Sequence, residues 1–140
     1  MMSLFGNKEG SANPFVRVEF LDSIKQTPYK KKTLNPVFND QFFFEKKMSK
    51  VELEDSSIIF TVLDYNGPLQ KSTVIGSFEL DITSVYFSLN HELYQATLVL
   101  VDPEDDQAAG PSGLLKVSVQ VLGPDDEPTI HDINYKKNPV

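Results

Sequence analysis

The chain has 140 residues, which suits one domain with a single core rather than two. Hydrophobic residues make up 40% and charged residues 24%, as in ordinary globular proteins, and no apolar run approaches the roughly 18 residues that a membrane-spanning helix needs. The lack of cysteine excludes disulfides and thiol catalysis, and a net charge of −7 argues against a general nucleic-acid binder. Since the start also lacks a secretory signal pattern, we expect a cytoplasmic protein.

Strands are predicted along most of the chain, because apolar and polar residues alternate with the period of two that is typical of half-buried strands. In chain order, the segments that we interpret as strands are 15–20, 27–33, 38–44, 58–62, 78–82, 98–100 and 115–121. Residues 83–92 do not alternate, which favours a short helical turn, and residues 102–113 form an acidic loop. Seven strands separated by turn residues indicate an all-β antiparallel sandwich.

Charge is unevenly distributed along the chain. Residues 17–50 contain eight basic and four acidic side chains, giving +4, whereas residues 51–140 contain four basic and fifteen acidic ones, giving −11. We therefore expect one side of the domain to attract anions while the rest stays acidic.

Three segments resemble, in the right order, the characteristic motifs of C2 domains. They are NPFVRV at residues 13–18, KTLNPVFND at 32–40 followed by Phe42 and Phe44, and VLDY at 62–65 with the later pair Ile75-Gly76. The resemblance implies a C2-type β-sandwich at residues 1–128, followed by a polar tail at 129–140.

The C-terminal half is similar to an internal C2 domain of the ferlin family, most like the second. The segments that carry this similarity are IGSFELDI at 75–82, Val85-Tyr86, DPED at 102–105 and VLGPDDEP at 121–128. Ferlins are large tail-anchored proteins with several C2 domains that act in vesicle fusion and membrane repair, so the chain is either a fragment or a stand-alone relative. C2 domains of this strand order carry a longer strand ahead of the first calcium loop, so we expect the first strand to be absent, which would leave an open sheet edge.

The resemblance places the calcium-ligand positions of C2 domains at Asn7, Asn13, Asp64 and Asn66, with Ser72 or Thr73 where a further aspartate is expected. Calcium takes six to eight oxygen ligands and needs several carboxylates to offset the loss of its water. One carboxylate among neutral substitutes is too little, so we expect no cofactor and a calcium-independent domain. The alternative interpretation of Asp64 is a turn residue at the end of a strand.

Lysines mark a candidate lipid-binding surface, since the resemblance matches them to the basic strands that bind acidic phosphoinositides. The expected lipid-binding residues are Lys25, Lys30, Lys32 and Lys46. On a strand, Lys30 and Lys32 would share one face while Lys31 points elsewhere. The alternative is a solvated edge that resists aggregation.

Other candidates are weaker. Leu4, Phe5, Pro68 and Leu69 are apolar residues that could insert into lipid from loop tips, although Phe5 fits the core better. The acidic run at 102–106 lacks the ligand spacing of an EF-hand, and His91 and His131 lie far apart without a nucleophile motif. We therefore expect no catalytic residues and no enzyme activity.

Two functions remain open. The first is a peripheral module in membrane trafficking that binds anionic phospholipids without calcium. The alternative is a protein-interaction or structural module that a partner completes by adding a strand.

Overall fold

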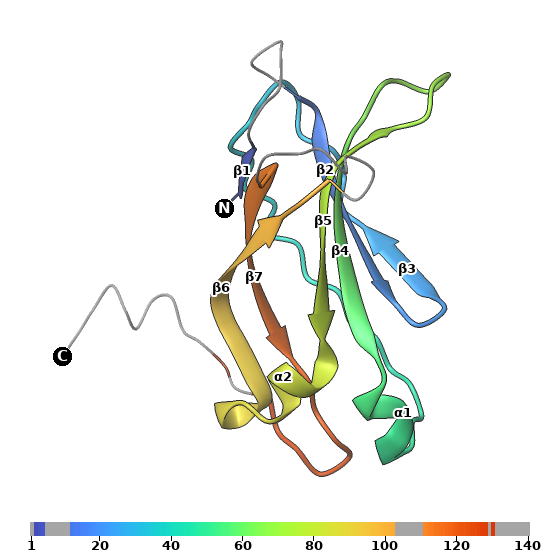
Figure 1. Cartoon of the computed structure of the whole chain (residues 1–140), viewed down its shortest axis with the longest axis vertical. Coiled ribbons are helices and arrows are strands. Elements are labelled where there is room, and N and C mark those ends of the chain that lie inside the picture. Colours follow the sequence, from blue (N-terminus) through green and yellow to red (C-terminus); the bar gives the residue numbers. More distant parts are fainter. Residues whose placement is uncertain (1, 5–11, 103–110, 129, 131–140) are drawn as a thin grey trace, which may run out of the picture.

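Two antiparallel sheets make up the domain (Figure 1), as seen in a computed structural model that describes residues 2–4, 12–102, 111–128 and 130. The strands of this described part are β1 (Met2–Leu4), β2 (Pro14–Phe20), β3 (Ser23–Gln26), β4 (Ser57–Asp64), β5 (Thr73–Asp81), β6 (Glu92–Leu100) and β7 (Gly113–Gln120). Its helical segments are α1 (Lys50–Glu54), α2 (Ile82–Tyr86) and the 3₁₀ turn η1 (Leu89–His91). The expected all-β sandwich is confirmed.

The larger sheet has the strand order β3-β2-β4-β5. Its register aligns the apolar residues of neighbouring strands, since Val16 pairs with Val62 and Val18 with Phe60. All four of these side chains are buried, because directly opposed residues of an antiparallel pair project to the same face. The alternation in the sequence therefore predicts correctly which face of this sheet forms the core.

The smaller sheet has the order β1-β7-β6, and it packs its inner face against the larger sheet. Leu98 pairs with Leu115, and both are buried. Gly76 on β5 allows the two sheets to approach at one end, because a Cβ atom there would lie 2.9 Å from the Cβ of Leu100 and 2.2 Å from the Oγ of Ser112. A bridge between Ser77 and Val101 links the sheets at the same place.

Two predicted strands are wrong. Residues 27–33 continue the β2–β3 hairpin, but in the described part only Thr27, Lys30 and Thr33 among them make backbone–backbone hydrogen bonds. Pro28 cannot donate, and Lys32 adopts a positive φ of 47°. Residues 38–44 form no strand either, since no described strand pairs with them. The predicted helical turn in 83–92 is confirmed as part of α2 and as η1.

The expected absence of the first strand needs correction. Met2–Leu4 form β1, which pairs antiparallel with residues 113–115 of β7. A strand is defined by pairing with a neighbouring strand rather than by its length. Three residues are therefore enough when they lie beside an existing sheet edge. Among the described residues, β1 pairs only with residues 113–115 of β7.

The predicted boundary between the domain and the polar tail lies between residues 128 and 129. Residues 129 and 131–140 lie outside the described residues, so this division stays a prediction. Within the described residues, no helix has the length and apolar character that crossing a membrane requires.

Candidate functional site

Asn13 and Asp64 lie side by side where β2 begins and β4 ends, because Pro14 pairs with Asp64 in the sheet. One carboxylate oxygen of Asp64 accepts the backbone N–H of Asn13 at 2.8 Å. The amide side chain of Asn13 then links two further segments. Its Nδ2 donates to the carbonyl of Tyr65 at 3.4 Å, and its Oδ1 accepts the backbone N–H of Lys32 at 2.9 Å.

Asn66 makes a similar internal link within the loop that joins β4 to β5. Its Nδ2 donates to the carbonyl of Lys71 at 2.9 Å and to Thr73 Oγ1 at 2.7 Å. The amide therefore holds the two arms of the loop together, and Asn7, the remaining candidate position, lies outside the described residues.

These side chains do not fit a calcium ion. The described residues contain no group of three or more His, Cys, Asp or Glu side chains that could hold a metal. The Oδ1 of Asn13 and one oxygen of Asp64 already accept backbone N–H groups, and amide nitrogens of Asn13 and Asn66 donate to oxygens on the loops. A single carboxylate and a set of donors cannot replace the water shell of a divalent cation.

Asn13→Ala is expected to destabilise the domain by about 1 to 2 kcal/mol, because it removes both side-chain hydrogen bonds that tie the loops to β2. The free energy of unfolding in urea measures this loss. Gln70→Ala is the control, since Gln70 is an exposed residue of the β4–β5 loop. Equal stability of the two variants would contradict the linking role of Asn13.

The four lysines expected to bind lipid fall into two groups. Lys25 on β3 donates to the carbonyl of Phe43, and its ammonium lies 4.9 Å from the centre of the Phe44 ring. Lys46 forms an ion pair with Asp22 at 2.6 Å. Both ammonium groups thus contact nearby protein groups rather than standing apart from them.

Lys30 and Lys32 lie in a turn beside the start of β2, and we call residues 30–32 the lysine turn. The backbone N–H of Lys30 donates to Pro14 at 2.9 Å, and that of Lys32 donates to Asn13, so the turn is fixed to the start of β2. Lys31 and Lys32 are exposed and Lys30 is half-buried. Because the turn is not a strand, the expectation that Lys31 points away from its neighbours no longer has a basis.

An aromatic pair strengthens the attachment of this turn. The rings of Tyr29 and Tyr65 stack with their centres 4.3 Å apart and an angle of 19° between their planes. Sequence analysis missed this contact, because Tyr29 and Tyr65 are far apart in the chain. The only signal in the sequence was position, since Tyr65 ends the VLDY motif and Tyr29 lies just before the KTLNPVFND motif.

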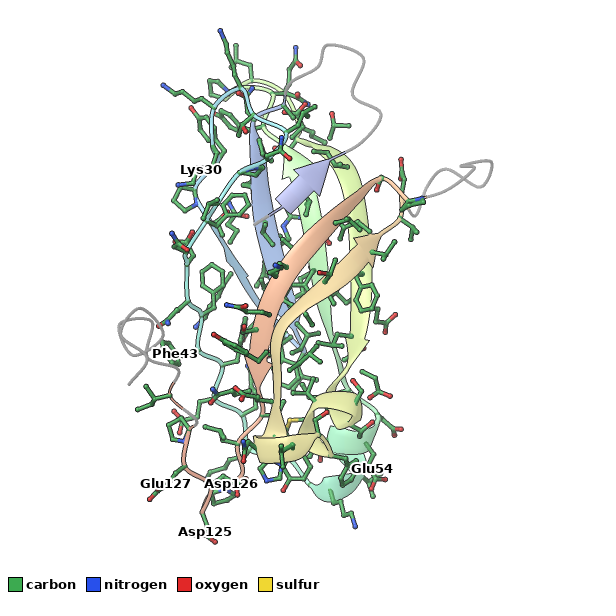
Figure 2. All side chains as sticks on the ribbon, turned by 90° about the vertical axis from the view of Figure 1, so that its left-hand side faces the viewer. Lys30, Phe43, Glu54, Asp125, Asp126 and Glu127 are labelled. Atoms are coloured by element: carbon green, nitrogen blue, oxygen red, sulfur yellow. The ribbon has the colours of Figure 1, made fainter. Side chains whose placement is uncertain are left out.

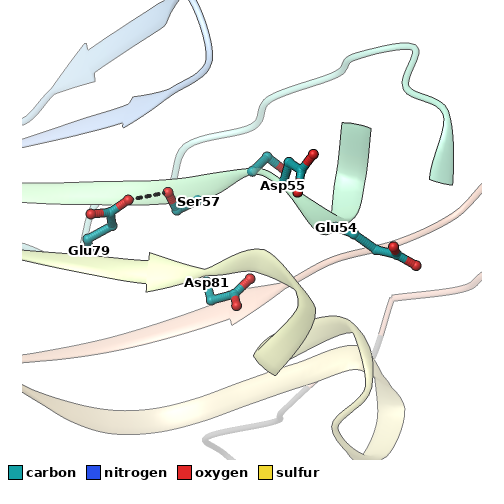
Figure 3. A pocket seen from close by; sticks show the side chains of 6 residues that line it. Glu54, Asp55, Ser57, Glu79 and Asp81 are labelled. Atoms are coloured by element: carbon teal, nitrogen blue, oxygen red, sulfur yellow. Dashed lines mark hydrogen bonds between the residues drawn. The ribbon is translucent and has the colours of Figure 1, made fainter. Parts of the chain in front are cut away.

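The ends of the molecule differ in charge. Figure 2 shows Lys30 near one end of the long axis and Glu54, Asp125, Asp126 and Glu127 near the other. At the acidic end, a shallow recess is lined by Glu54, Asp55, Ser57, Glu79 and Asp81 (Figure 3). Ser57 donates to the Glu79 carboxylate at 2.7 Å, and Asp81 caps α2 by accepting the N–H of Thr83. These contacts are structural, and we interpret the recess as a solvated acidic surface.

The remaining candidates are placed as follows. Leu69 is 95% exposed in the β4–β5 loop, next to the exposed Pro68. The side chain of Leu4 and all of Phe5 are not among the described parts of the structure. His91 contacts the carbonyl of Tyr86 through Nδ1, and its Nε2 lies 3.7 Å from Asp126. His131 and residues 103–106 of the acidic run lie outside the described residues.

A model of the C2 domain family matches residues 3–98, which is more than half of the chain. This chain belongs to the C2 domain family. Its start at β1, its two sheets and the loops around Asn13 and Asp64 are accordingly those of a C2 domain, and the fold inferred from the motifs is confirmed.

Ferlins are among the relatives of this C2 domain. It is 35% identical over 117 residues to myoferlin of Xenopus tropicalis and 31% identical over 137 residues to Ferlin 2 of Tetrahymena thermophila, matches that cover 84% and 96% of the chain. The chain spans only 6% and 8% of those two proteins. The expected relation to ferlins is thus confirmed, while the match to one particular ferlin domain stays a prediction.

Solved structures of other C2 proteins have the same fold. A structure of CC2D1B superposes with a TM-score of 0.68 at 20% identity, covering 85% of this chain and 50% of that one. A structure that holds a pair of C2 domains from extended synaptotagmin 2 gives 0.64 at 17% identity, covering 85% and 35%. At such low identity, these likenesses support the architecture alone.

Proposed function

We propose that this C2 domain is a cytoplasmic, peripheral module that binds anionic phospholipid membranes or vesicle-trafficking assemblies without calcium. The observation that carries the proposal is the lysine turn, whose backbone is hydrogen-bonded to Asn13 at a position where other C2 domains hold calcium. Three adjacent lysines on this fixed backbone bring positive charge to the end where a bound cation would bring it.

The charge distribution orients the domain on a membrane. Each lysine near an anionic surface contributes about 1 kcal/mol to binding, and three are adjacent in the lysine turn. The exposed Leu69 lies in the β4–β5 loop, and Tyr65 of that loop stacks on Tyr29, the residue before the lysine turn. The acidic recess at the far end would then face away from the lipid (Figures 2 and 3).

Calcium independence follows from the links that the two asparagines make. In a calcium-binding C2 domain, converging carboxylates repel one another until the cation joins them. Here the amides of Asn13 and Asn66 join the same loops directly. The proposed function therefore includes no cofactor and no catalytic step, and it excludes nucleic acid as a partner.

Lys46 carries a further positive charge, which forms an ion pair with the carboxylate of Asp22. The hydrogen bond from Lys46, together with its positive charge, holds the pKa of Asp22 below the ordinary value of 3.8. A carboxyl group with a lowered pKa loses its pairing only as the pH falls through that pKa, so the pair persists at neutral pH. Membrane binding is accordingly expected not to change through loss of this pair between pH 6 and 8, since both values lie well above 3.8.

Asp22→Asn is expected to change binding to phosphoinositide vesicles by no more than about twofold, because the Lys46 that it releases lies on the segment before α1, away from the lysine turn. Asp40→Asn removes the same charge from an exposed position and serves as the control. Vesicle titration of both variants measures the difference. A gain of about fivefold in Asp22→Asn alone would show that Lys46 contacts the lipid and would contradict the proposed orientation.

A second candidate is a protein-interaction module completed by strand addition. One observation favours it, namely that among the described residues β1 pairs only with residues 113–115 of β7. The lysine turn and this edge are different parts of the fold, so the two functions do not exclude each other.

Co-sedimentation with vesicles that contain phosphoinositide tests the leading proposal. The domain is expected to sediment equally with calcium and with chelator. Failure to sediment in both conditions would reject membrane binding, whereas sedimentation only with calcium would reject the interpretation of the two asparagines.

A further inference from the structure

We propose that Asn66 and Gly67 form a self-modification site, at which the side-chain amide of Asn66 turns into a carboxylate without an enzyme. The new negative charge then weakens the membrane contact of the lysine turn. The chemical step stands by itself, whereas its effect on membrane binding rests on the function proposed above.

Asn66 and Gly67 lie in the loop that joins β4 to β5, and Figure 1 shows this loop projecting beyond the ends of both strands. Asn66 is exposed, and both residues lie outside the helices and strands of the described part. Water therefore reaches the Asn66 amide, and the backbone can rearrange there without breaking a ladder of hydrogen bonds.

The step is an attack within the chain. The backbone nitrogen of Gly67 attacks Cγ of Asn66 and gives its proton to the solvent. The bond from Cγ to Nδ2 breaks, and that nitrogen takes up a proton and leaves as ammonia. Water then opens the resulting cyclic imide at one of its carbonyls, which leaves aspartate or isoaspartate. Water is the only co-reactant, and the proximity of the two groups makes the attack effective.

The attacking nitrogen is not held by another contact. Among the described residues, the N–H of Gly67 makes no hydrogen bond to backbone or side chain. Gly67 has a φ of 94°, which a residue without a side chain adopts readily, and a Cβ atom built there would meet no atom within 4 Å. The backbone at Gly67 therefore has both the conformational freedom and the space to bring its nitrogen to Cγ of Asn66.

The other asparagines of the described part lack this combination. Asn13 and Asn35 each precede a proline, whose nitrogen carries no hydrogen and cannot form the imide. The N–H that follows Asn90 donates to the carbonyl of Ser88 at 2.9 Å. Asn39 is followed by an aspartate, whose side chain restricts the backbone where glycine leaves it free. Asn66 is thus the asparagine that the structure favours for this reaction.

Two hydrogen bonds restrain the amide. Nδ2 of Asn66 donates to the carbonyl of Lys71 at 2.9 Å and to Thr73 Oγ1 at 2.7 Å. The side chain must leave both acceptors before its Cγ can meet the nitrogen of Gly67. Because Lys71 and Thr73 are exposed, this opening is local and does not require the domain to unfold. Loss of one acceptor should therefore speed the conversion.

Conversion changes both the loop and its charge. A carboxylate cannot donate to the carbonyl of Lys71, so that link across the loop is lost. Asn66 follows Tyr65, which stacks on Tyr29, the residue before the lysine turn. The new charge arises next to this stack and counteracts the attraction of the lysine turn to anionic lipid.

The test incubates the full chain at neutral pH and follows each asparagine by mass spectrometry of its peptides. We expect the mass at Asn66 to rise by the difference between an amide and an acid, with aspartate and isoaspartate both present. Conversion at Asn39 and Asn90 should be slower by about tenfold or more, because the residue after each of them carries a side chain. No conversion at Asn66, or equal rates at Asn66 and Asn39, would overturn the inference.

Thr73→Val tests the restraint on the amide. It keeps a branched side chain and removes the oxygen that accepts from Nδ2, so we expect conversion at Asn66 to become about threefold faster. Thr97→Val makes the same change at an exposed position on β6 and should leave the rate unchanged. A rate in Thr73→Val no higher than in this control would contradict the role of the hydrogen bond.

Asn66→Asp carries the charge of the product from the start. It should bind phosphoinositide vesicles about fivefold more weakly than the original chain, the effect of one charge near an anionic surface. Gln95→Glu makes the same change from amide to acid at an exposed position on β6 and should alter binding by less than about twofold. Equal binding by the two variants would contradict the effect on the lysine turn.

The two proposals can fail separately. If the original chain does not bind vesicles, the proposed function is rejected, while the rates of conversion at Asn66 and Asn39 still decide the chemical step. If the original chain binds and Asn66 does not convert, the self-modification site is rejected and the proposed function stands.

Discussion

Replacing Lys30, Lys31 and Lys32 by Glu is expected to weaken binding to phosphoinositide vesicles by about 100-fold or more. Each lysine contributes about 1 kcal/mol near an anionic surface, and the three substitutions also add three negative charges that the lipid repels. The hydrogen bonds that fix the turn involve backbone N–H groups, so the substitutions should leave its position unchanged.

The matched control changes the same number of charges elsewhere. The control uses three exposed lysines: Lys47 precedes α1, Lys50 is the first residue of α1, and Lys116 lies on β7. Replacing these three by Glu should weaken binding far less, at equal ionic strength. If both triple variants lose binding equally, net charge rather than the lysine turn governs the interaction, and the proposed orientation is wrong.

Leu100→Ala is expected to lower the free energy of unfolding by about 3 kcal/mol. Leu100 has no exposed surface and lies opposite Gly76, where the two sheets approach. Truncation leaves a cavity that neither sheet can close, because the bridge between Ser77 and Val101 fixes their separation. Thermal unfolding should shift down by roughly 10 °C for a domain of this size.

Val99→Ala is the control for this substitution. Val99 is the neighbour of Leu100 on β6, but it projects to the opposite face and is 47% exposed. Its truncation should cost about 0.5 kcal/mol, since little apolar surface leaves the interior. Similar losses from both variants would contradict the assignment of Leu100 to the core between the sheets.

The fold could be predicted from the sequence because its strands alternate regularly and its C2 motifs fall in order. Val16, Val18 and Leu115 are buried as their spacing predicts. The segment around Phe42 and Phe44 shows the limit of such reasoning. Its alternation correctly predicts an extended chain with one inward face, but a strand also requires a neighbouring backbone, and no local pattern shows whether that neighbour is present.

The candidate site was predicted less completely. Asn13 and Asp64 lie together as the motif spacing implies. The hydrogen bond from Lys32 to Asn13 could not be foreseen, because it depends on the positive φ of Lys32 and on a long-range contact between two loops. The pairing of Lys46 with Asp22 likewise joins residues whose proximity only the folded chain determines.

Co-sedimentation with phosphoinositide vesicles, across a calcium series that begins with chelator, tests most directly the claim that the lysine turn makes this C2 domain a calcium-independent membrane module. We expect the bound fraction to be the same at every calcium concentration and to fall to background in the variant with Glu at positions 30, 31 and 32. A bound fraction that rises from background with calcium, or one that the variant retains, would contradict this account.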